Sequence, residues 1–386
     1  MERGQESDRD DGPAGGRGAC AVRIGFHGRL EDRPEIRAGF IGCGSHAFRN
    51  IYPTFQFAPV RLAATCDLDG ERARAFAERF GAESSYTDYH EMLEKEDLDA
   101  VFVVTGYDAD GRPLYPAIAS ECLRAGVHVW IEKPPAASCE EISKLQSLSR
   151  ETGKTVMVGF KKMFFPANEK ARELMHLEDF GGATLVSVQY PQGIPAAGEL
   201  RRYVQGGPAE GGMVGFLDHL CHPVSLIVFL LGMPATLFYQ RSEAGSGAAV
   251  FTFDTGEVAV LSLTAGQSPS GGMERTLIVG RGRHIVVENN IRVSYHRNPP
   301  VGYGDNPDFF RGTPEETTAV WEPEFSLGQL YNKGLFLLGY YGEVREFAES
   351  ILEGRLPAKG TLEQAWQVTR VFEAFAGGPG QVIPLT

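Results

Sequence analysis

Residues 36–47 join a short apolar run to the glycine pattern of a phosphate-binding turn, G-x-G-x-x-A. Gly42 would permit a tight turn, Gly44 would let the backbone approach a pyrophosphate, and Ala47 would allow close packing. The backbone N–H groups that open the next helix can then donate to phosphates. In a chain with 47 glycines the pattern alone is a weak signal. The residues expected to contact a dinucleotide here are Gly42, Cys43, Gly44, Ser45, His46 and Ala47.

A carboxylate strengthens this interpretation. Asp67 ends the next apolar run, 23 residues after Gly44, where it can accept hydrogen bonds from the ribose hydroxyls of an adenosine. Such a group would repel a 2′-phosphate, so the sequence favours NAD as cofactor, with NADP less favoured. Asp69 is a second candidate, Arg72 would weaken the preference, and either aspartate can instead cap the following helix.

The elements around this turn form a βαβ series. Nearly continuous apolar runs, typical of buried parallel strands, alternate with segments of helical spacing, and Ser138 with Glu141 forms a capping box. The pattern predicts an α/β Rossmann domain, with a mostly parallel doubly wound sheet, over residues 35–160. A flexible tail is expected over residues 1–34, where only 21–26 could form a strand. The expected strands are 36–41, 60–65, 100–105, 127–131 and 156–160, and the expected helices are 71–80, 90–95, 115–125 and 138–152.

Residues 161–386 show a different pattern, in which short alternating strands are separated by turns such as 254–256. This predicts an α+β domain with a large, mostly antiparallel open sheet. Two amphipathic stretches near the end, 342–352 and 362–376, are expected to be helices that return to pack on the first domain. The expected strands are 183–190, 248–253, 258–263, 276–279 and 284–288.

His222 is the candidate acid/base, because an imidazole titrates near neutrality and can take the hydroxyl proton of an alcohol. Asp218, four residues earlier, shares a face with it if the segment is helical. Pro223 complicates this, since a helix tolerates proline best in its first turn and would then begin near His222. His222 can alternatively be a structural core histidine or a helix cap, and His219 is expected to point away from Asp218.

Two further motifs carry a resemblance. Residues 129–134 read VWIEKP at the end of an expected strand, and residues 211–223 read GGMVGFLDHLCHP. With the glycine turn, and in this order, they resemble the glucose-fructose oxidoreductase and inositol dehydrogenase (Gfo/Idh/MocA) family. Its members carry the same kind of turn, an E-K-P at this strand end, and a later aspartate and histidine four apart. The match spans residues 36–386.

The resemblance implies a function and several site residues. Lys133 would lie between nicotinamide and substrate and donate to the reacting oxygen, while Asp218 would orient the substrate or the histidine. Thr105, Glu132 and Lys133 would contact the cofactor. The substrate would be a sugar, glycoside or cyclitol with a secondary alcohol or ketone carbon, and the protein a homodimer or homotetramer built on the open sheet face. Without the resemblance, Lys133 would be taken for a solvated surface lysine.

The sequence also departs from that family. It has Thr105-Gly106-Tyr107 where relatives have Thr-Pro and a histidine, Lys161-Lys162 in place of an Asn-Arg or Arg-Arg pair, and Ser225 in place of a common aspartate. Contacts to the cofactor ribose and to substrate hydroxyls are therefore expected to differ. Tyr107 and Lys161 are candidates for substrate binding.

Composition excludes other classes of function. The net charge of −13 disfavours nucleic acid as a partner, and the six cysteines form no C-x-x-C pair, which suits a reducing cytoplasm. The start of the chain lacks a signal-peptide pattern, the apolar run 226–231 is too short for a membrane, and no metal motif occurs. The alternatives left open are an NAD-dependent glycoside-cleaving enzyme that oxidises its sugar transiently and a non-catalytic dinucleotide-binding regulator.

Overall fold

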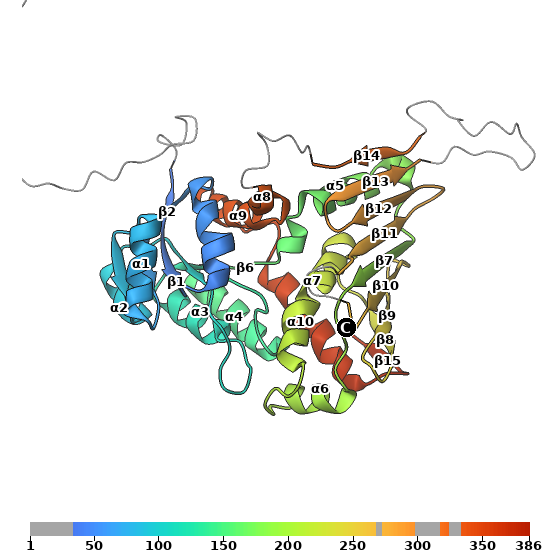
Figure 1. Cartoon of the computed structure of the whole chain (residues 1–386), viewed down its shortest axis with the longest axis horizontal. Helices are drawn as coiled ribbons and strands as arrows, with labels where there is room; N and C mark the ends of the chain where they lie inside the picture. The colour runs from blue at the N-terminus through green and yellow to red at the C-terminus, as the bar shows by residue number, and fades with distance from the viewer. Residues whose placement is uncertain (1–33, 268–271, 298–316, 324–332) are drawn as a thin grey trace, which may run out of the picture.

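The computed structural model describes residues 34–267, 272–297, 317–323 and 333–386. The expected tail, including the possible strand 21–26, lies outside these residues. The described chain forms two sheets with helices between and around them (Figure 1).

The first sheet has six parallel strands in the order β3-β2-β1-β4-β5-β6, which confirms the doubly wound Rossmann prediction. Its two central strands, β1 and β4, are buried except at Arg37, as their nearly continuous apolar runs indicate. β3 was not predicted, because it has three residues and none of them is fully buried. The strands are β1 (Ile36–Ile41), β2 (Val60–Cys66), β3 (Ser84–Tyr86), β4 (Ala100–Val103), β5 (His128–Ile131) and β6 (Val156–Val158).

The helices of this domain end where their local sequence predicts. The capping box of Ser138 and Glu141 is present at the start of α4 (Cys139–Thr152), and Gly153 ends this helix in the left-handed conformation. The segment after the glycine turn is irregular: a π-helix, η1 (Ala47–Ile51), is followed by a 3-10 helix, η2 (Tyr52–Gln56), which Pro53 opens. The other helices are α1 (Gly70–Phe80), α2 (Tyr89–Lys95) and α3 (Tyr115–Arg124).

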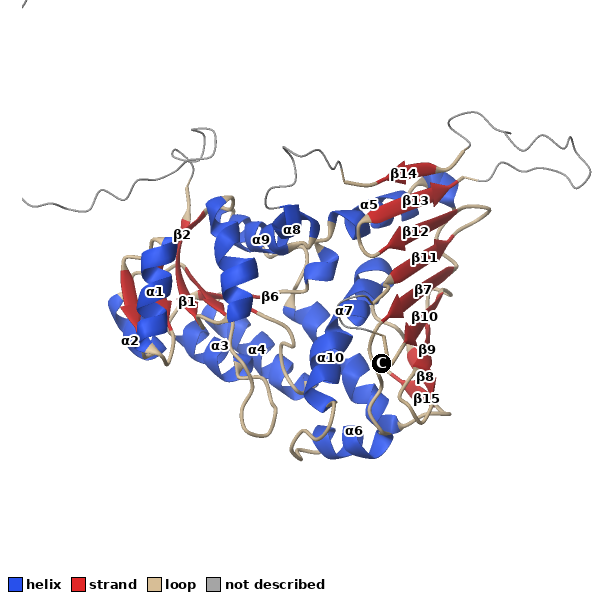
Figure 2. Cartoon of the chain, viewed as in Figure 1, coloured by secondary structure: helices blue, strands red, loops and turns tan. Residues whose placement is uncertain are grey.

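The second sheet has nine strands in the order β14-β13-β12-β11-β7-β10-β9-β8-β15 (Figure 2). Neighbouring strands are antiparallel except β7 and β10, so the prediction of a mostly antiparallel sheet is confirmed. The strands β8, β13, β14 and β15 were not predicted. The strands are β7 (Leu185–Tyr190), β8 (Thr236–Arg241), β9 (Gly247–Thr252), β10 (Val258–Leu263), β11 (Arg275–Val279), β12 (His284–Glu288), β13 (Arg292–His296), β14 (Ala319–Trp321) and β15 (Val382–Pro384).

One face of this sheet packs against helices. Along β10, Ala259, Leu261 and Leu263 are fully buried, while the alternate side chains are half-buried on the opposite face. Figure 2 shows the helices gathered on the side of the sheet that faces the first domain. They include α5 (Pro166–Met175), α6 (Ala197–Val204) and α7 (Met213–Leu231).

Helix α7 corrects one prediction. It begins at Met213, well before His222, and Pro223 lies in its interior. The proline lacks the N–H that would bond the carbonyl of His219, but nearly every residue from Leu220 to Leu230 is buried, and this packing outweighs the lost bond. Among the described helices, α7 is also the one long and apolar enough to cross a membrane, yet 67% of its most apolar window is buried inside the protein.

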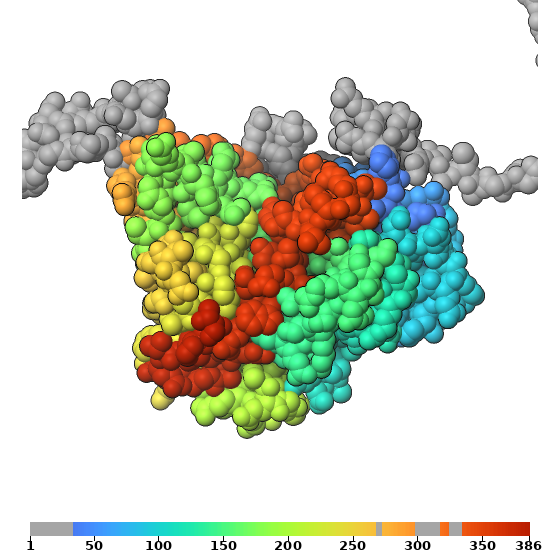
Figure 3. Space-filling model, turned by 180° about the vertical axis from the view of Figure 1, so that it is seen from behind, coloured from blue at the N-terminus to red at the C-terminus, as the bar shows by residue number. Residues whose placement is uncertain are grey.

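The end of the chain returns to the first domain. α10 (Leu362–Ala374) packs between α4 and α7, and Glu373 accepts a hydrogen bond of 2.8 Å from the backbone N–H of Cys139. α9 (Tyr340–Leu352), preceded by the short helix α8 (Lys333–Leu337), packs on β1 and η1. Figure 3 shows this red segment between the two halves of the molecule.

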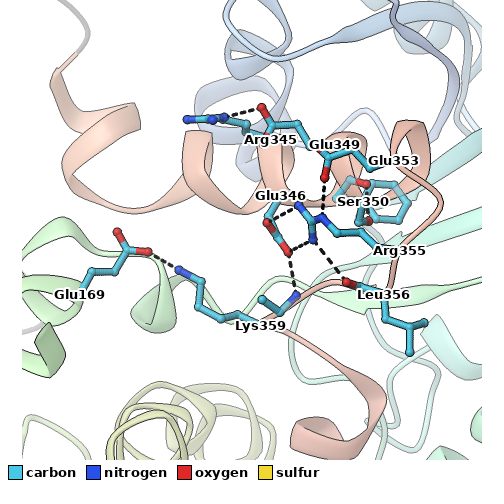
Figure 4. A network of polar contacts seen from close by, with 11 residues as sticks. Glu169, Arg345, Glu346, Glu349, Ser350, Glu353, Arg355, Leu356 and Lys359 are labelled. Carbon is cyan, nitrogen blue, oxygen red and sulfur yellow. Dashed lines mark hydrogen bonds and ion pairs between the residues drawn. The ribbon is translucent and has the colours of Figure 1, made fainter. Parts of the chain in front are cut away.

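The loop between α9 and α10 is fixed by a polar network (Figure 4). Glu346 of α9 accepts hydrogen bonds from Arg355 at 2.6 and 3.1 Å and from the backbone of Ala358 at 2.7 Å. Lys359 pairs with Glu169 of α5, and so ties the loop to the second domain. The C-terminal helices are thereby held in one place relative to both sheets.

Candidate active site and cofactor-binding site

Gly42 and Gly44 of the glycine turn are glycines for two different reasons. Gly42 has φ +101°, and a Cβ built on it would lie 2.0 Å from the carbonyl oxygen of Val104, so the turn itself requires glycine there. A Cβ built on Gly44 would meet nothing within 4 Å. This open space beside backbone that leads into the helix at Ser45 fits the approach of a pyrophosphate. Ala47 is fully buried beneath the turn.

Asp67 lies directly beside this turn. Its carboxylate accepts hydrogen bonds from the backbone N–H of Cys43 at 2.8 Å and of Asp69 at 3.0 Å. Asp69 is the residue that caps α1, accepting from the N–H groups of Glu71 and Arg72. The capping alternative therefore applies to Asp69, and Asp67 holds the turn while its remaining lone pairs stay available. Arg72 lies 3.4 Å from Asp67 and 3.3 Å from Asp69.

Cys43 contributes its backbone to the turn. Its side chain is buried, with the sulfur 3.5 Å from the hydroxyl of Tyr52. Burial raises the pKa of the Cys43 thiol to about 11, so the side chain stays a neutral thiol near pH 7. What Cys43 offers a ligand is therefore its position in the turn and not a thiolate.

Glu132 links the turn to the end of β5. Its carboxylate accepts from His46 Nε2 at 2.8 Å and from the backbone N–H of Lys133 at 2.9 Å. Burial alone would raise the pKa of Glu132, but the bond from His46 and the charges of Lys133 and Lys161 outweigh it and lower the pKa. The buried carboxylate is therefore ionised.

Thr105 follows β4 at the same edge of the sheet. Its backbone carbonyl accepts a hydrogen bond of 2.8 Å from the hydroxyl of Tyr115. Its own hydroxyl is buried and has no hydrogen-bond partner among the described residues. Buried polar atoms are normally satisfied, so this orphaned oxygen fits a site completed by a bound cofactor.

Lys133, Asp218 and Tyr107 meet at the boundary between the two domains. Lys133 Nζ lies 2.6 Å from Asp218 Oδ1, and the hydroxyl of Tyr107 donates to the same oxygen at 3.2 Å. The side chain of Lys133 is only 13% exposed, so this residue is not a solvated surface lysine. Burial lowers its pKa, but the charges of Glu132 and Asp218 outweigh that effect and raise it, so Lys133 is an ammonium at neutral pH.

His222 lies one helical turn after Asp218 and is 9% exposed. Burial lowers its pKa well below the usual value, and the charges of Lys133, Lys161 and Lys162 lower it further. The ring is therefore neutral near pH 7 and can accept a proton or a hydrogen bond.

One prediction about this helix is wrong. His219 does not point away from Asp218, because its Nε2 lies 3.4 Å from Asp218 Oδ2 and its ring centroid lies 6.3 Å from that of His222. Successive residues of a helix diverge, but a half-exposed imidazole is long enough to fold back over its neighbour. The carboxylate of Asp218 contacts Lys133, Tyr107 and His219.

His222 opens onto a cavity of about 250 Å³ that is lined by residues of the second domain. Most of its polar lining was not predicted from the sequence. Lys162 pairs with Glu274, which also accepts a bond of 2.8 Å from Asn290, and burial lowers the pKa of Lys162 to about 8. The cavity is lined by Lys161, Lys162, Phe165, Tyr190, His222, Gly272, Glu274, Asn289, Asn290 and Leu338.

The sequence alone does not indicate that these residues line the cavity. Asn289 and Asn290 have φ values of 46° and 57° and form the turn between β12 and β13. An Asn-Asn pair between two strands indicates a turn, but nothing local indicates that the turn reaches the cavity. Among the described residues, no group of three or more His, Cys, Asp or Glu side chains is placed to hold a metal ion.

Comparisons with known proteins bear on this arrangement. Residues 36–160 match the sequence model of the GFO_IDH_MocA group, described as an oxidoreductase family with an NAD-binding Rossmann fold. The chain is 27% identical over 286 residues to dTDP-3,4-didehydro-2,6-dideoxy-alpha-D-glucose 3-reductase of Streptomyces violaceoruber, covering 72% of this chain and 78% of the relative. It is 21% identical over 333 residues to myo-inositol 2-dehydrogenase of Thermotoga maritima, covering 84% and 90%.

The chain belongs to the Gfo/Idh/MocA family. Solved structures agree with the fold of this Gfo/Idh/MocA protein over both domains. A dehydrogenase from Chromobacterium violaceum has a TM-score of 0.74 at 20% identity, covering 90% of this chain and 96% of that one. An oxidoreductase from Agrobacterium radiobacter, solved with NAD+, L-tartaric acid and magnesium, has a TM-score of 0.71 at 15% identity, covering 91% and 98%.

Family membership settles the general activity. This Gfo/Idh/MocA protein is an NAD(P)-dependent oxidoreductase, and its first domain is the family's NAD-binding Rossmann fold. The open space at Gly44 and the orphaned hydroxyl of Thr105 fit that cofactor at the carboxyl edge of the first sheet.

Proposed function

We propose that this protein transfers a hydride between NAD and a secondary alcohol or ketone carbon of a sugar, glycoside or cyclitol. The observation that carries the proposal is the Lys133 ammonium, held 2.6 Å from Asp218 in the same cluster of charges as the neutral imidazole of His222. The names of the relatives, a sugar reductase and an inositol dehydrogenase, support this substrate class.

We assign the cofactor to the residues around the glycine turn. The backbone of Gly42, Cys43, Gly44, Ser45, His46 and Ala47 would hold the pyrophosphate, with Thr105, Glu132 and Lys133 nearer the nicotinamide. NAD, when bound, supplies the carbon that accepts or gives up the hydride. Asp67, whose carboxylate is fixed beside the turn, favours NAD, because a 2′-phosphate would meet a second negative charge.

We assign the chemistry to three side chains. His222, neutral and largely enclosed, would take the proton of the substrate hydroxyl in oxidation and return it in reduction. Lys133, an ammonium whose pKa is raised, would donate to the reacting oxygen and stabilise negative charge there. Asp218 would act as a positioning residue, because its carboxylate fixes the direction of the Lys133 amine and of the Tyr107 hydroxyl. Tyr107 and Lys161 would contact the substrate.

The proposal is tested by initial rates with NAD and NADP on a panel of sugars, glycosides and inositols. Lys133→Met should lower kcat about 10²- to 10³-fold, the usual cost of removing one donor to a developing oxyanion. Lys144→Met is the matched control, since Lys144 is exposed on α4 and pairs only with Glu140 one turn away. Wild-type turnover of none of these compounds, or a Lys133→Met variant as fast as wild type, contradicts the proposal.

The same panel separates the alternatives. Cofactor that stays with the protein through gel filtration, together with glycoside cleavage and no net NADH, would favour transient oxidation. Binding of NAD without turnover of any compound would favour a regulator.

We also propose that the protein is a homodimer or homotetramer built on the outer face of the second sheet. Side chains such as Val250, Val260 and Leu277 are only half-buried on that face. An extended, half-buried apolar surface of this kind is typical of an interface. Light scattering after gel filtration, compared with Val260→Lys, measures the assembly, and a wild-type monomer contradicts it.

A further inference from the structure

The three lysines of the site differ in their partners. Lys133 contacts Asp218, and Lys162 contacts Glu274. Among the described residues, Lys161 Nζ instead donates its hydrogen bond to a neutral group, the hydroxyl of Tyr340, at 2.9 Å. It also lies 4.9 Å from the centroid of the Tyr340 ring. Lys161 is half-buried, and a lysine that is largely withdrawn from water usually has a carboxylate as partner, so the exception needs an explanation.

Two carboxylates near Lys161, those of Glu132 and Glu274, already bind other groups. Glu132 is bound to His46 and to the backbone of Lys133, and Glu274 is bound to Lys162 and Asn290. Neither is within ion-pair distance of Lys161.

Glu343 of α9 is the remaining candidate counter-ion. It is completely buried, and neither of its carboxyl oxygens has a hydrogen-bond partner among the described residues. Burial raises its pKa well above the usual value, and the charge of Glu132 raises it further. Burial therefore favours the neutral acid at Glu343, and its carboxyl oxygens make no hydrogen bond to Lys161.

Lys161 is placed where a substrate can reach it. It lines the same cavity as His222, and the cavity has room for one compact ring. An ammonium removed from water and given only a phenol as partner loses hydration that a negative ligand would restore. Lysine binds carboxylates and phosphates as a point charge and without strict geometry.

We propose that the substrate carries an anionic oxygen group, a carboxylate or a phosphate, which the Lys161 ammonium binds in the cavity beside His222. The protein then acts on an acidic sugar or cyclitol in preference to a neutral one. This rests on the proposed function for the reaction itself and adds the charge of the substrate.

The experiment compares sugars with the same ring that carry a neutral or an anionic group at C6: glucuronate and glucose 6-phosphate against glucose, and galacturonate against galactose, each with NAD. Wild type should show a kcat/KM about tenfold to a hundredfold higher for an anionic member, the worth of one charge-assisted hydrogen bond. The uronate and phosphate arms distinguish the two sources of charge. Equal values for the charged and neutral members overturn the proposal.

Two variants locate the preference. Lys161→Met should abolish it, chiefly through KM, while Lys161→Arg should keep most of it because the charge remains. If Lys161→Met lowers kcat/KM equally for charged and neutral sugars, Lys161 does not recognise an anion. A parallel loss of NADH affinity in Lys161→Met would assign the lysine to the cofactor instead, and also overturns the proposal.

Calorimetry separates this inference from the proposed reaction. The same sugars are titrated into wild type and Lys161→Met in the presence of saturating NADH. Tighter, Lys161-dependent binding of the anions without any turnover supports the charge preference and contradicts the reaction. Turnover together with equal binding of charged and neutral sugars supports the reaction and contradicts the charge preference. If no sugar binds, the proposed reaction and the charge preference are both overturned.

Discussion

The glycine turn after β1 presents backbone to its ligand, whereas the cavity beside α7 presents buried charged side chains. The turn is made of consecutive residues, and the carboxylate of Asp67 bonds directly to its backbone. The cavity collects Lys161, Lys162, Glu274 and His222 from three segments far apart in the chain. One region depends on the shape of the backbone, and the other depends on how charges are paired and desolvated.

The largest expected effect separates two glycines of the turn. Gly42→Ala should lower the free energy of unfolding by about 2–4 kcal/mol, because φ is +101° and the new Cβ would overlap the carbonyl of Val104. Gly44→Ala should leave stability nearly unchanged and raise the Kd for NAD, since its Cβ enters the open space. Urea unfolding and calorimetry measure the two effects. Equal destabilisation by both would remove the distinction between a packed and an open glycine.

The second largest effect concerns Glu343, the buried acid of α9. The folded pKa of Glu343 is raised above its unfolded value, so its stabilising contribution is present below about pH 4.5 and is lost as pH rises toward the folded pKa. Glu343→Gln removes this dependence. The variant should gain stability relative to wild type by up to about 1.4 kcal/mol per pH unit over that window. Urea unfolding at a series of pH values checks it, and parallel curves for the two proteins would mean that Glu343 is ionised when folded.

A smaller effect concerns cofactor choice. Asp67→Ser should raise the ratio of kcat/KM for NADP to that for NAD by about tenfold, because tenfold requires only about 1.4 kcal/mol of relieved repulsion. Asp69→Ser is the matched control, since serine also caps a helix and α1 should stay intact. An equal change of the ratio in both variants would assign the preference to α1 and not to the turn.

The smallest effect concerns the pH profile. His222 has a pKa lowered by burial and then by three lysines, so oxidation should keep its rate below pH 6.5. Lys162→Met removes one of these charges and should raise the pKa of His222, which moves the acid limb of kcat/KM to higher pH. A limb that moves to lower pH, or one that Lys144→Met moves equally, would show that another group controls it.

The same contrast explains how much the sequence could predict. Five of the six strands of the first domain, the turn and Asp67 were predicted because apolar runs and glycine spacing are local signals. Asp218 and His222 were placed four apart, but Pro223 made the helix start uncertain, since its long-range packing cannot be read locally. The ion pair of Lys162 with Glu274 and the buried Glu343 depend on contacts between residues more than a hundred positions apart, or between helices of different domains.

The return of the C-terminal helices has a consequence for synthesis on the ribosome. α10 lies against α4 of the nucleotide-binding half, and β15, the last strand of the second sheet in sequence order, pairs with β8. A nascent chain that has emerged as far as β6 has every strand of the first sheet but lacks the helices that cover β1 and α4. This half therefore has an exposed apolar surface until α9 and α10 have been synthesised, and a stop codon before Leu362 would leave both halves without α10.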